Sequence, residues 1–165
     1  MRYLIDTNIF LFYAFSNHLL DDAVRQIIEN YENSIYISSE SVKEVIHLLQ
    51  SGKIKTKMWK SANDIFENIE NVSHCTIKYV NEQHLRTFAA LDRVENHNDP
   101  SDRLIIAQAI TKKLPLISSD RKFEHYRKQK LNFIYRHCYV SIDSELFLYF
   151  INNKRDNSSI SILLE

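Results

Sequence analysis

The chain has 165 residues, a length that fits one domain with a buried core of its own. Its 44% hydrophobic and 12% aromatic residues exclude an intrinsically disordered protein, which lacks the apolar surface needed to fold. Basic and acidic residues number 21 each, so the net charge is zero. This balance excludes a uniformly basic surface, and any nucleic-acid site must be a local patch.

The two cysteines, Cys75 and Cys138, stand alone in the sequence. They form no CxxC pair and no Cys/His cluster with the spacing of a zinc site. We expect two buried thiols in a reducing compartment rather than a disulfide. The sequence also has no long apolar run that would serve as a signal peptide or span a membrane, so we expect a soluble, cytoplasmic protein.

The first half of the chain alternates short apolar runs with segments of helical spacing. The predicted strands cover residues 3–5 and 35–37. The predicted helices cover residues 21–31, 41–52 and 57–69. Gly52, the single glycine of the chain, is expected to end the second helix. The last two helices should form an antiparallel pair.

The second half repeats this alternation. The predicted strands cover residues 76–80, 114–117 and 132–135. The predicted helices cover residues 82–91 and 100–110, and a polar loop at 93–99 separates them. Alternating strands and helices predict an α/β fold, in which a central, mostly parallel sheet is covered by helices on both faces.

Four acidic residues occupy related places in this predicted fold. Asp6 and Asp120 each come just after a short apolar strand, and Glu44 and Asp102 each fall near the start of a helix. Ligands of open α/β sheets gather at the carboxyl ends of the strands, so the four carboxylates should converge there. Such a cluster persists when a cation is bound, and ligation by oxygen alone suits Mg²⁺ or Mn²⁺ better than zinc.

Each acid also has a local structural explanation. Asp99 and Pro100 form a sound helix start, with Asp102 facing the positive end of the helix. Ser41 and Glu44 have the spacing of a capping box. Asp6 alone would be a turn residue and Asp120 a cap. Taken singly, these residues are helix caps more often than catalysts, but their order along one sheet edge favours a site.

Four segments resemble the PIN-domain nucleases, and in particular the VapC-type toxins of bacterial toxin–antitoxin pairs. The segments are YLIDTN at 3–8, ISSESVKE at 37–44, NDPSDRLIIAQA at 98–109, and LISSDRKF at 116–123 followed by Tyr126. They span residues 1 to about 136. No single segment is decisive, but the ordered set is fairly specific.

The resemblance implies an acidic quartet at Asp6, Glu44, Asp102 and Asp120. It implies that Asp6, Asp102 and Asp120 hold the cation, chiefly through Asp6 and Asp102. The expected cation is Mg²⁺, and Mn²⁺ is the alternative. The residues that match supporting positions of the family are Thr7, Ser118 and Asp99. Two departures concern substrate choice more than chemistry: Ser101 replaces an aromatic residue, and Lys112-Lys113 replaces a glycine that ends the helix.

The implied function is metal-dependent hydrolysis of RNA phosphodiester bonds by a toxin with a cognate antitoxin and a tendency to form homodimers. The implied fold is the three-layer PIN-like α/β/α domain with a protruding helix pair, over residues 1–137. Residues 138–165 are expected to be an extension that packs on the same domain. Within it, a helix over 144–151 and an apolar run at 160–164 are the recognisable features.

Cations near the site are candidates for contacts with the RNA backbone. We expect Arg103, Arg121 and Lys122 to serve this role, whereas the lysines at 53–60 are more simply a solvated face. His97, two residues before Asp99, could touch substrate, but a loop histidine is more often simply solvated, and we expect no histidine to have a role in the site.

Two other classes of function compete with a nuclease. A PIN-like module that binds RNA or protein without activity would be free to lose an acid, yet the quartet is intact. A haloacid-dehalogenase-like phosphatase needs a second Asp two residues after Asp6, where this chain has Asn8. The kind of RNA substrate stays open.

Overall fold

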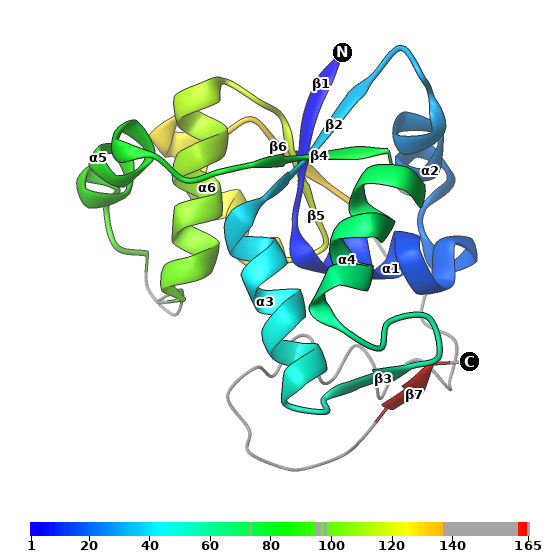
Figure 1. The fold of residues 1–165 in the computed structure, drawn as a ribbon. Helices are drawn as coiled ribbons and strands as arrows, with labels where there is room; N and C mark the ends of the chain where they lie inside the picture. Colours follow the sequence, from blue (N-terminus) through cyan, green and yellow to red (C-terminus); the bar gives the residue numbers. More distant parts are fainter. Residues whose placement is uncertain (73, 95–96, 98, 137–161, 165) are drawn as a thin grey trace.

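A five-stranded sheet in which every pairing is parallel forms the centre of the protein (Figure 1). The computed structural model describes residues 1–72, 74–94, 97, 99–136 and 162–164. The strands lie in the order β4-β2-β1-β5-β6. They are β1 (Arg2–Ile5), β2 (Ser34–Ser38), β4 (Cys75–Lys78), β5 (Leu116–Ser118) and β6 (Phe133–Tyr135). The predicted α/β fold with a mainly parallel central sheet is confirmed.

Helices follow the strands along the chain. The α-helices are α1 (Thr7–Ser16), α2 (Asp22–Glu29), α3 (Ser39–Gln50), α4 (Ala62–Glu67), α5 (Glu82–Ala90) and α6 (Pro100–Lys112). Two 3-10 helices are η1 (Asn17–Leu19) and η3 (Arg121–Gln129), and a π-helical segment, η2 (Asn68–Val72), follows α4.

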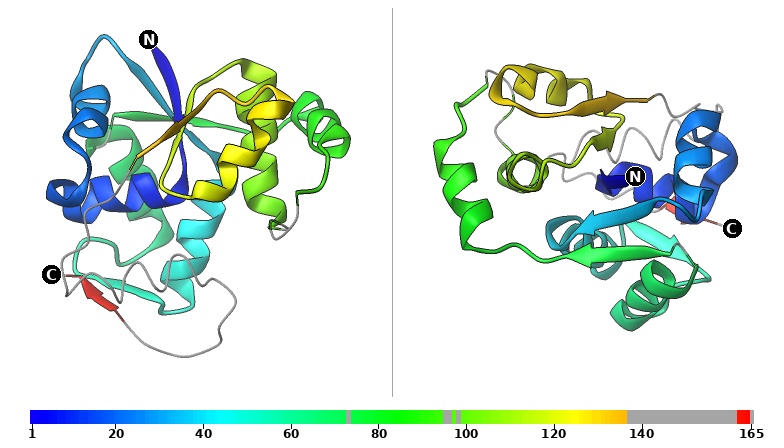
Figure 2. Two further views of the ribbon diagram at one scale, coloured as in Figure 1. Left: turned by 180° about the vertical axis from the view of Figure 1, so that it is seen from behind. Right: turned by 90° about the horizontal axis from the view of Figure 1, so that it is seen from above.

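Different helices cover the two faces of the sheet, which gives three layers (Figure 2). On one face, Ile5, Ile35 and Ile117 belong to an apolar cluster with side chains of α1, α2, α3 and α4. On the other face, Leu4 and Leu116 belong to a second cluster with side chains of α6 and η3. Neighbouring residues of one strand join different clusters because successive side chains point to opposite faces of a sheet.

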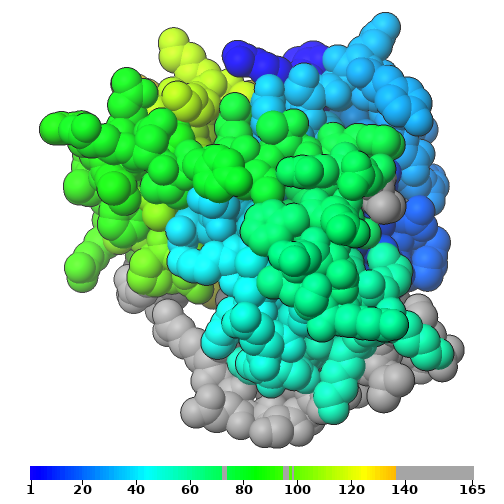
Figure 3. Space-filling view, in the orientation of Figure 1, coloured from blue at the N-terminus to red at the C-terminus, as the bar shows by residue number. Residues whose placement is uncertain are grey.

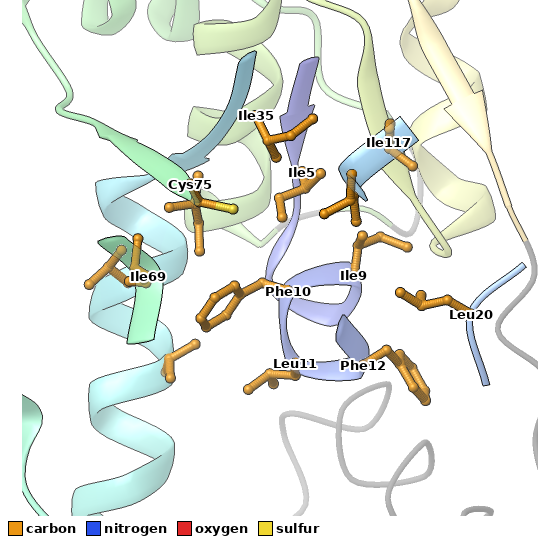
Figure 4. Close-up of a cluster of buried hydrophobic side chains, with 14 of the residues drawn as sticks. Ile5, Ile9, Phe10, Leu11, Phe12, Leu20, Ile35, Ile69, Cys75 and Ile117 are labelled. Carbon is orange, nitrogen blue, oxygen red and sulfur yellow. The ribbon is translucent and has the colours of Figure 1, made fainter. Parts of the chain in front are cut away.

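Helix α1 is an element that the sequence pattern did not predict. All of its residues from Thr7 to Phe12 are buried, and Figure 4 shows Ile9, Phe10 and Leu11 among the core side chains. A helix buried on all sides has no polar face, so the spacing of apolar residues does not reveal it. Asp6 starts the helix as its N-cap.

The segment between α3 and β4 departs from the predicted helix pair. A second helix was predicted over 57–69, but α4 covers only part of this range, and Ile54–Thr56 forms an additional strand, β3. Helical structure continues through η2 to Val72, so the predicted helix is confirmed from Ala62 onward and its predicted start at residue 57 is wrong. α3 and α4 do pack against each other, on the face of the molecule shown in Figure 3.

Trp59 explains why the second helix starts late. Its ring is buried and stacks on Phe10 of α1, with the ring centroids 6.1 Å apart. This contact holds the chain outside a helical path until Ser61 and Asp64, whose capping box begins α4. Phe10 and Trp59 are 49 residues apart in the sequence, so the local spacing of apolar residues cannot predict their contact.

Residues in the left-handed backbone region end α3 and α6. Gly52, with φ of 68°, follows α3 and donates its N–H to the carbonyl of Leu49, which confirms the predicted helix end. Helix α6 ends at Lys113, with φ of 53°. A side chain makes this conformation unfavourable, so α6 ends on a strained residue where a glycine would not be strained.

Strand β3 pairs in parallel with β7 (Ile162–Leu164), which lies in the apolar run near the C-terminus. The predicted helix at 144–151 and Cys138 lie outside the described residues. The domain boundary at residue 137 stays a prediction.

The sequence predicted a buried Cys75 and no membrane-spanning segment. Cys75 is a buried thiol, and burial raises its pKa to about 12, so it stays protonated and unreactive at neutral pH. Within the described part of the chain, no helix has both the length and the apolar character that crossing a membrane requires.

Candidate metal centre

The carboxyl ends of β1 and β5 lie where the strand order of the sheet reverses. From β1 the sheet continues through β2 to β4 on one side, and through β5 to β6 on the other (Figure 1). The segments after these two adjacent strands, α1 and η3, pack on opposite faces. Such a switch point leaves a crevice at the carboxyl edge, where α/β proteins bind ligands. Asp6 follows β1, and Asp120 follows β5 by two residues.

The hydroxyl of Ser118 joins the ends of these two strands. It donates a hydrogen bond to Asp6 Oδ2 and accepts one from the Asp120 N–H at 2.9 Å. Asp6 Oδ1 also accepts from the Ile9 N–H at 2.8 Å. Asp6 is only 5% exposed. A carboxylate removed from water in this way is stabilised by a nearby positive charge, which makes the position suitable for a cation.

Glu44 is joined to the same edge through Thr7. Thr7 Oγ1 donates to Glu44 Oε2 at 2.7 Å, which links α1 to α3. Helix α3 has Ser38 as its N-cap, so Ser41 and Glu44 do not form the capping box that their spacing suggested. Glu44 instead lies in the second turn of α3, where its carboxylate meets the hydroxyl of the residue next to Asp6.

Helix α6 begins where the sequence predicted. Asp99 is its N-cap and accepts from the N–H groups of Ser101 and Asp102, at 2.9 and 3.4 Å, and Pro100 is its first residue. Ser101 Oγ donates to Glu40 Oε2 at 3.2 Å, which ties α6 to α3. A pocket of about 290 Å³ lies beside this contact. It is lined by Lys43, Glu44, His47, Asp99 and Ser101.

His97 belongs to the acidic site, and the prediction of a solvated loop histidine is wrong. It is 3% exposed, and its Nε2 lies 3.5 Å from Asp102 Oδ2. His97, Asp102 and Asp120 each offer one ligand atom, and these atoms all lie within 4.8 Å of one another. Its position two residues before the N-cap Asp99 was the only cue in the sequence, because the side chains that bury it come from η3.

Two hydroxyl groups and one proximity relate the four predicted acids. Thr7, which follows Asp6 in the chain, donates to Glu44, and Ser118 bridges Asp6 and Asp120. Ligand atoms of Asp120 and Asp102 lie within 4.8 Å of each other. Asp6 is not one of the three residues whose ligand atoms lie within 4.8 Å of one another. It is connected to Asp120 by the hydrogen bonds of Ser118.

Arg103 contacts the end of α5 and the hydroxyl of Tyr126 in η3. Its guanidinium donates to the Leu91 carbonyl at 2.9 Å and lies over the Phe88 ring, 5.0 Å from the centroid. These contacts hold α6 against α5. Burial raises the pKa of the Tyr126 hydroxyl, and the positive charge of Arg103 offsets only part of this rise. Tyr126 is therefore neutral at physiological pH.

Arg121 and Lys122 lie in the first turn of η3, next to Asp120. Asp120 caps this helix by accepting from the Lys122 N–H at 2.8 Å. Both cationic residues are exposed. Arg121 Nε donates to the Tyr135 hydroxyl at 2.9 Å. The two positive charges thus lie at the rim of the acidic site.

The donor set fits a divalent cation. Carboxylate oxygens of Asp102 and Asp120 are hard ligands, and the imidazole of His97 adds a nitrogen. His97 Nε2 is buried and has no hydrogen-bond partner among the described residues. An unsatisfied nitrogen beside two carboxylates is the feature that an ion would complete.

Comparison with known structures gives the same fold. VapBC2 from Rickettsia felis, solved bound to a DNA fragment from its promoter, is 20% identical with a TM-score of 0.58, covering 82% of this chain and 99% of that one. VapBC-1 from nontypeable Haemophilus influenzae is 19% identical with a TM-score of 0.56, covering 82% and 98%. A toxin–antitoxin complex from Klebsiella pneumoniae is 19% identical with a TM-score of 0.54, covering 80% and 95%. No curated protein sequence matches.

The sequence profile of the PIN domain matches residues 3–129. This range runs from Tyr3 in β1 past β5 and contains all the acids of the candidate metal centre. At the identities above, the solved structures establish the shared fold only. The family profile covers most of the chain, and the chain therefore belongs to the PIN domain family.

Proposed function

We propose that this chain is an endoribonuclease that depends on a divalent cation, Mg²⁺ or Mn²⁺. The observation that carries the proposal is the grouping of Asp102 and Asp120 with His97, within 4.8 Å, at the edge where Ser118 ties Asp120 to the buried Asp6. PIN domain toxins are generally nucleases, which supports hydrolysis of a phosphodiester bond. RNA as the substrate is the expectation from the sequence motifs.

The side chains of the site have separate roles in this proposal. Asp6, Asp102 and Asp120 would hold the cation. When bound, a divalent cation supplies Lewis-acid activation of the phosphate and of a water molecule. Glu44, oriented by Thr7 and facing the pocket that it shares with Asp99, would orient the attacking water and accept its proton at a carboxylate oxygen.

Cations at the rim would hold the RNA backbone. Arg121 and Lys122 are exposed and adjoin Asp120, so they can contact phosphates on either side of the scissile bond. Arg103 is engaged with Leu91 and Phe88, so it is not available for this role.

We also propose that the chain is the toxin of a toxin–antitoxin pair. The structures that share its fold come from such pairs. A cationic side chain of the antitoxin would neutralise the acidic edge. An apolar pocket of about 420 Å³, with Ile46, Phe66 and Ile77 in its lining, offers a contact surface on the neighbouring face. A second copy of the chain is a further expected partner.

Cleavage of labelled RNA by the purified chain tests the proposed activity. Single-stranded RNA should be cut with Mg²⁺ or Mn²⁺ and left intact with a chelator, and single-stranded DNA of the same sequence should be cut more slowly. Expression of the chain without a partner should stop bacterial growth. If no RNA is cut with either cation, the proposal is wrong.

A further inference from the structure

We propose that His97 is itself a metal ligand, through Nε2, and that the site therefore binds Mn²⁺ more tightly than Mg²⁺. This inference rests on the metal site of the proposed function, but not on the cleavage of RNA. It adds a nitrogen ligand to the expected oxygen ligands, so that His97 joins Asp102 and Asp120 in a mixed nitrogen and oxygen site.

The position of the imidazole nitrogen is the first argument. His97 Nε2 lies 3.5 Å from Asp102 Oδ2, and within 4.8 Å of an oxygen of Asp120 as well. Bonds of about 2.1 Å to one ion place ligand atoms up to about 4.2 Å apart, so small rotations of the carboxylates suffice. Both acids come from elements that begin at the same crevice, α6 and η3.

The burial of this nitrogen is the second argument. Nε2 has no hydrogen-bond partner among the described residues, although the side chain is 3% exposed. Leaving a buried polar group unsatisfied costs about 1 to 3 kcal/mol. A histidine with a purely structural role would be expected to hydrogen-bond through both nitrogens, whereas the contact of Nε2 with Asp102 Oδ2 at 3.5 Å does not meet hydrogen-bond geometry.

The other ring nitrogen is held as it is in metal-binding histidines. His97 Nδ1 lies 3.0 Å from the hydroxyl of Tyr126, which is fully buried. The rings of Phe123 and Tyr126 meet the imidazole edge to face, at centroid distances of 5.5 and 5.4 Å. If Nδ1–H donates to the Tyr126 oxygen, the lone pair of Nε2 points at the carboxylates. A partner on the second nitrogen fixes both the tautomer and the orientation of a ligating histidine.

The nitrogen ligand sets the preference among cations. Mg²⁺ prefers oxygen ligands in octahedral geometry and keeps several waters. First-row transition cations accept imidazole more readily, and their affinity for a mixed site rises from Mn²⁺ onward. The site should therefore bind Mn²⁺ more tightly than Mg²⁺, and His97 should account for the difference.

Calorimetric titration of the full chain with Mn²⁺ and with Mg²⁺ tests the inference. In His97→Gln we expect Mn²⁺ affinity to fall on the order of tenfold or more, with a much smaller change for Mg²⁺. The matched control is His125→Gln, which removes an exposed histidine of η3 and should leave both affinities unchanged. Equal affinity of His97→Gln and the parent chain for Mn²⁺ would overturn the inference.

Pulsed electron paramagnetic resonance on the unmodified chain gives an answer even if His97→Gln fails to fold. One equivalent of bound Mn²⁺ should show coupling to an imidazole ¹⁴N nucleus, and Asp102→Asn should abolish it. Absence of the coupling in the parent chain, or its persistence in Asp102→Asn, would overturn the inference.

The inference and the proposed function fail separately. RNA cleavage without any nitrogen coupling would remove His97 from the ligands and leave the ribonuclease in place. Nitrogen-coupled Mn²⁺ in a chain that cuts no RNA would keep His97 as a metal ligand and exclude the ribonuclease.

Discussion

Thr7 Oγ1 donates a hydrogen bond of 2.7 Å to Glu44 Oε2, which joins the first residue of α1 to the second turn of α3. Thr7 directly follows Asp6, the N-cap of α1. The same helix start therefore fixes two of the four acids, Asp6 through the cap and Glu44 through the hydroxyl. Thr7 is a positioning residue: it acts on the reaction through Glu44.

Replacing Thr7 tests this role. Thr7→Val removes the hydroxyl but keeps the shape of the side chain, so we expect kcat for RNA cleavage to fall roughly tenfold because Glu44 loses its orientation. KM should stay near the parent value, since no contact with substrate is lost. Thr7→Ser restores the donor and should recover most of the rate. A Thr7→Val chain with the parent kcat would show that Glu44 needs no such partner.

The charges at the start of η3 should govern RNA affinity and its response to salt. Reversing two phosphate contacts, Arg121→Glu with Lys122→Glu, should weaken binding and reduce the slope of log K against log salt by roughly 1.4 for single-stranded RNA. Binding is measured in an Asp6→Asn chain, so that the RNA stays intact. The control reverses Lys57 and Lys60, which are exposed but come from the segment before α4. An unchanged slope in the first variant would exclude Arg121 and Lys122 from the RNA site.

The positions of the acids in the candidate site could be predicted from the sequence, and the contacts of His97 and Arg103 could not. Asp6 and Asp120 follow short apolar runs. In a parallel sheet the residues that follow the strands lie together at its carboxyl edge. The burial of His97 depends on Tyr126, which is 29 residues further along the chain. No local sequence pattern predicts that contact. Arg103 neighbours Asp102 in sequence, but one step along a helix turns its side chain toward α5.

Lys113 offers a test of strain at the end of α6. It adopts φ of 53°, a conformation that glycine takes without strain, so Lys113→Gly should raise the free energy of unfolding by about 0.5 to 1 kcal/mol. The matched variant Lys112→Gly, one residue earlier and still helical, should lower it by a similar amount, about 0.5 to 1 kcal/mol. Urea unfolding of both variants gives the comparison. The same sign of change in the two variants would contradict this account of the helix end.

His84 should make stability depend on pH. Burial lowers the pKa of His84 in the folded chain, and the positive charges of Lys112 and Lys78 lower it further. As the pH falls through the unfolded value of about 6.5, the unfolded chain binds a proton that the folded chain resists, so stability falls. Protonation would also disrupt the contact in which Nδ1 accepts from the Asn81 N–H at 3.1 Å.

Thermal unfolding between pH 8 and pH 5 measures this effect. His84→Gln keeps an acceptor at this capping-box position and should show a smaller loss of stability on acidification than the parent chain. Replacement of the exposed His125 by Gln is the control and should follow the parent curve. A His84→Gln curve parallel to that of the parent would assign the acid sensitivity to other groups.

The fold could be predicted where short apolar runs or apolar residues at helical spacing mark an element, and less well where neither pattern does. Most strands of the central sheet are short apolar runs between polar segments, and β4 instead alternates apolar residues with Thr76 and Lys78. Helix α1 was missed because residues Thr7 to Phe12 are buried on every side. The helix predicted from residue 57 begins only at Ala62 because Trp59 packs on Phe10 instead of continuing a helical face.

RNA cleavage by Asp6→Asn, compared with the parent chain at the same Mg²⁺ or Mn²⁺ concentration, tests the central claim most directly. Asparagine keeps the cap on α1 but removes the charge, so the variant should fold with near-parent stability and lose cleavage by at least a factor of about 100. Asp22→Asn, at an exposed position of α2, is the matched control and should cut at the parent rate. An Asp6→Asn chain that cuts RNA as fast as the parent would contradict a metal-dependent ribonuclease at this site.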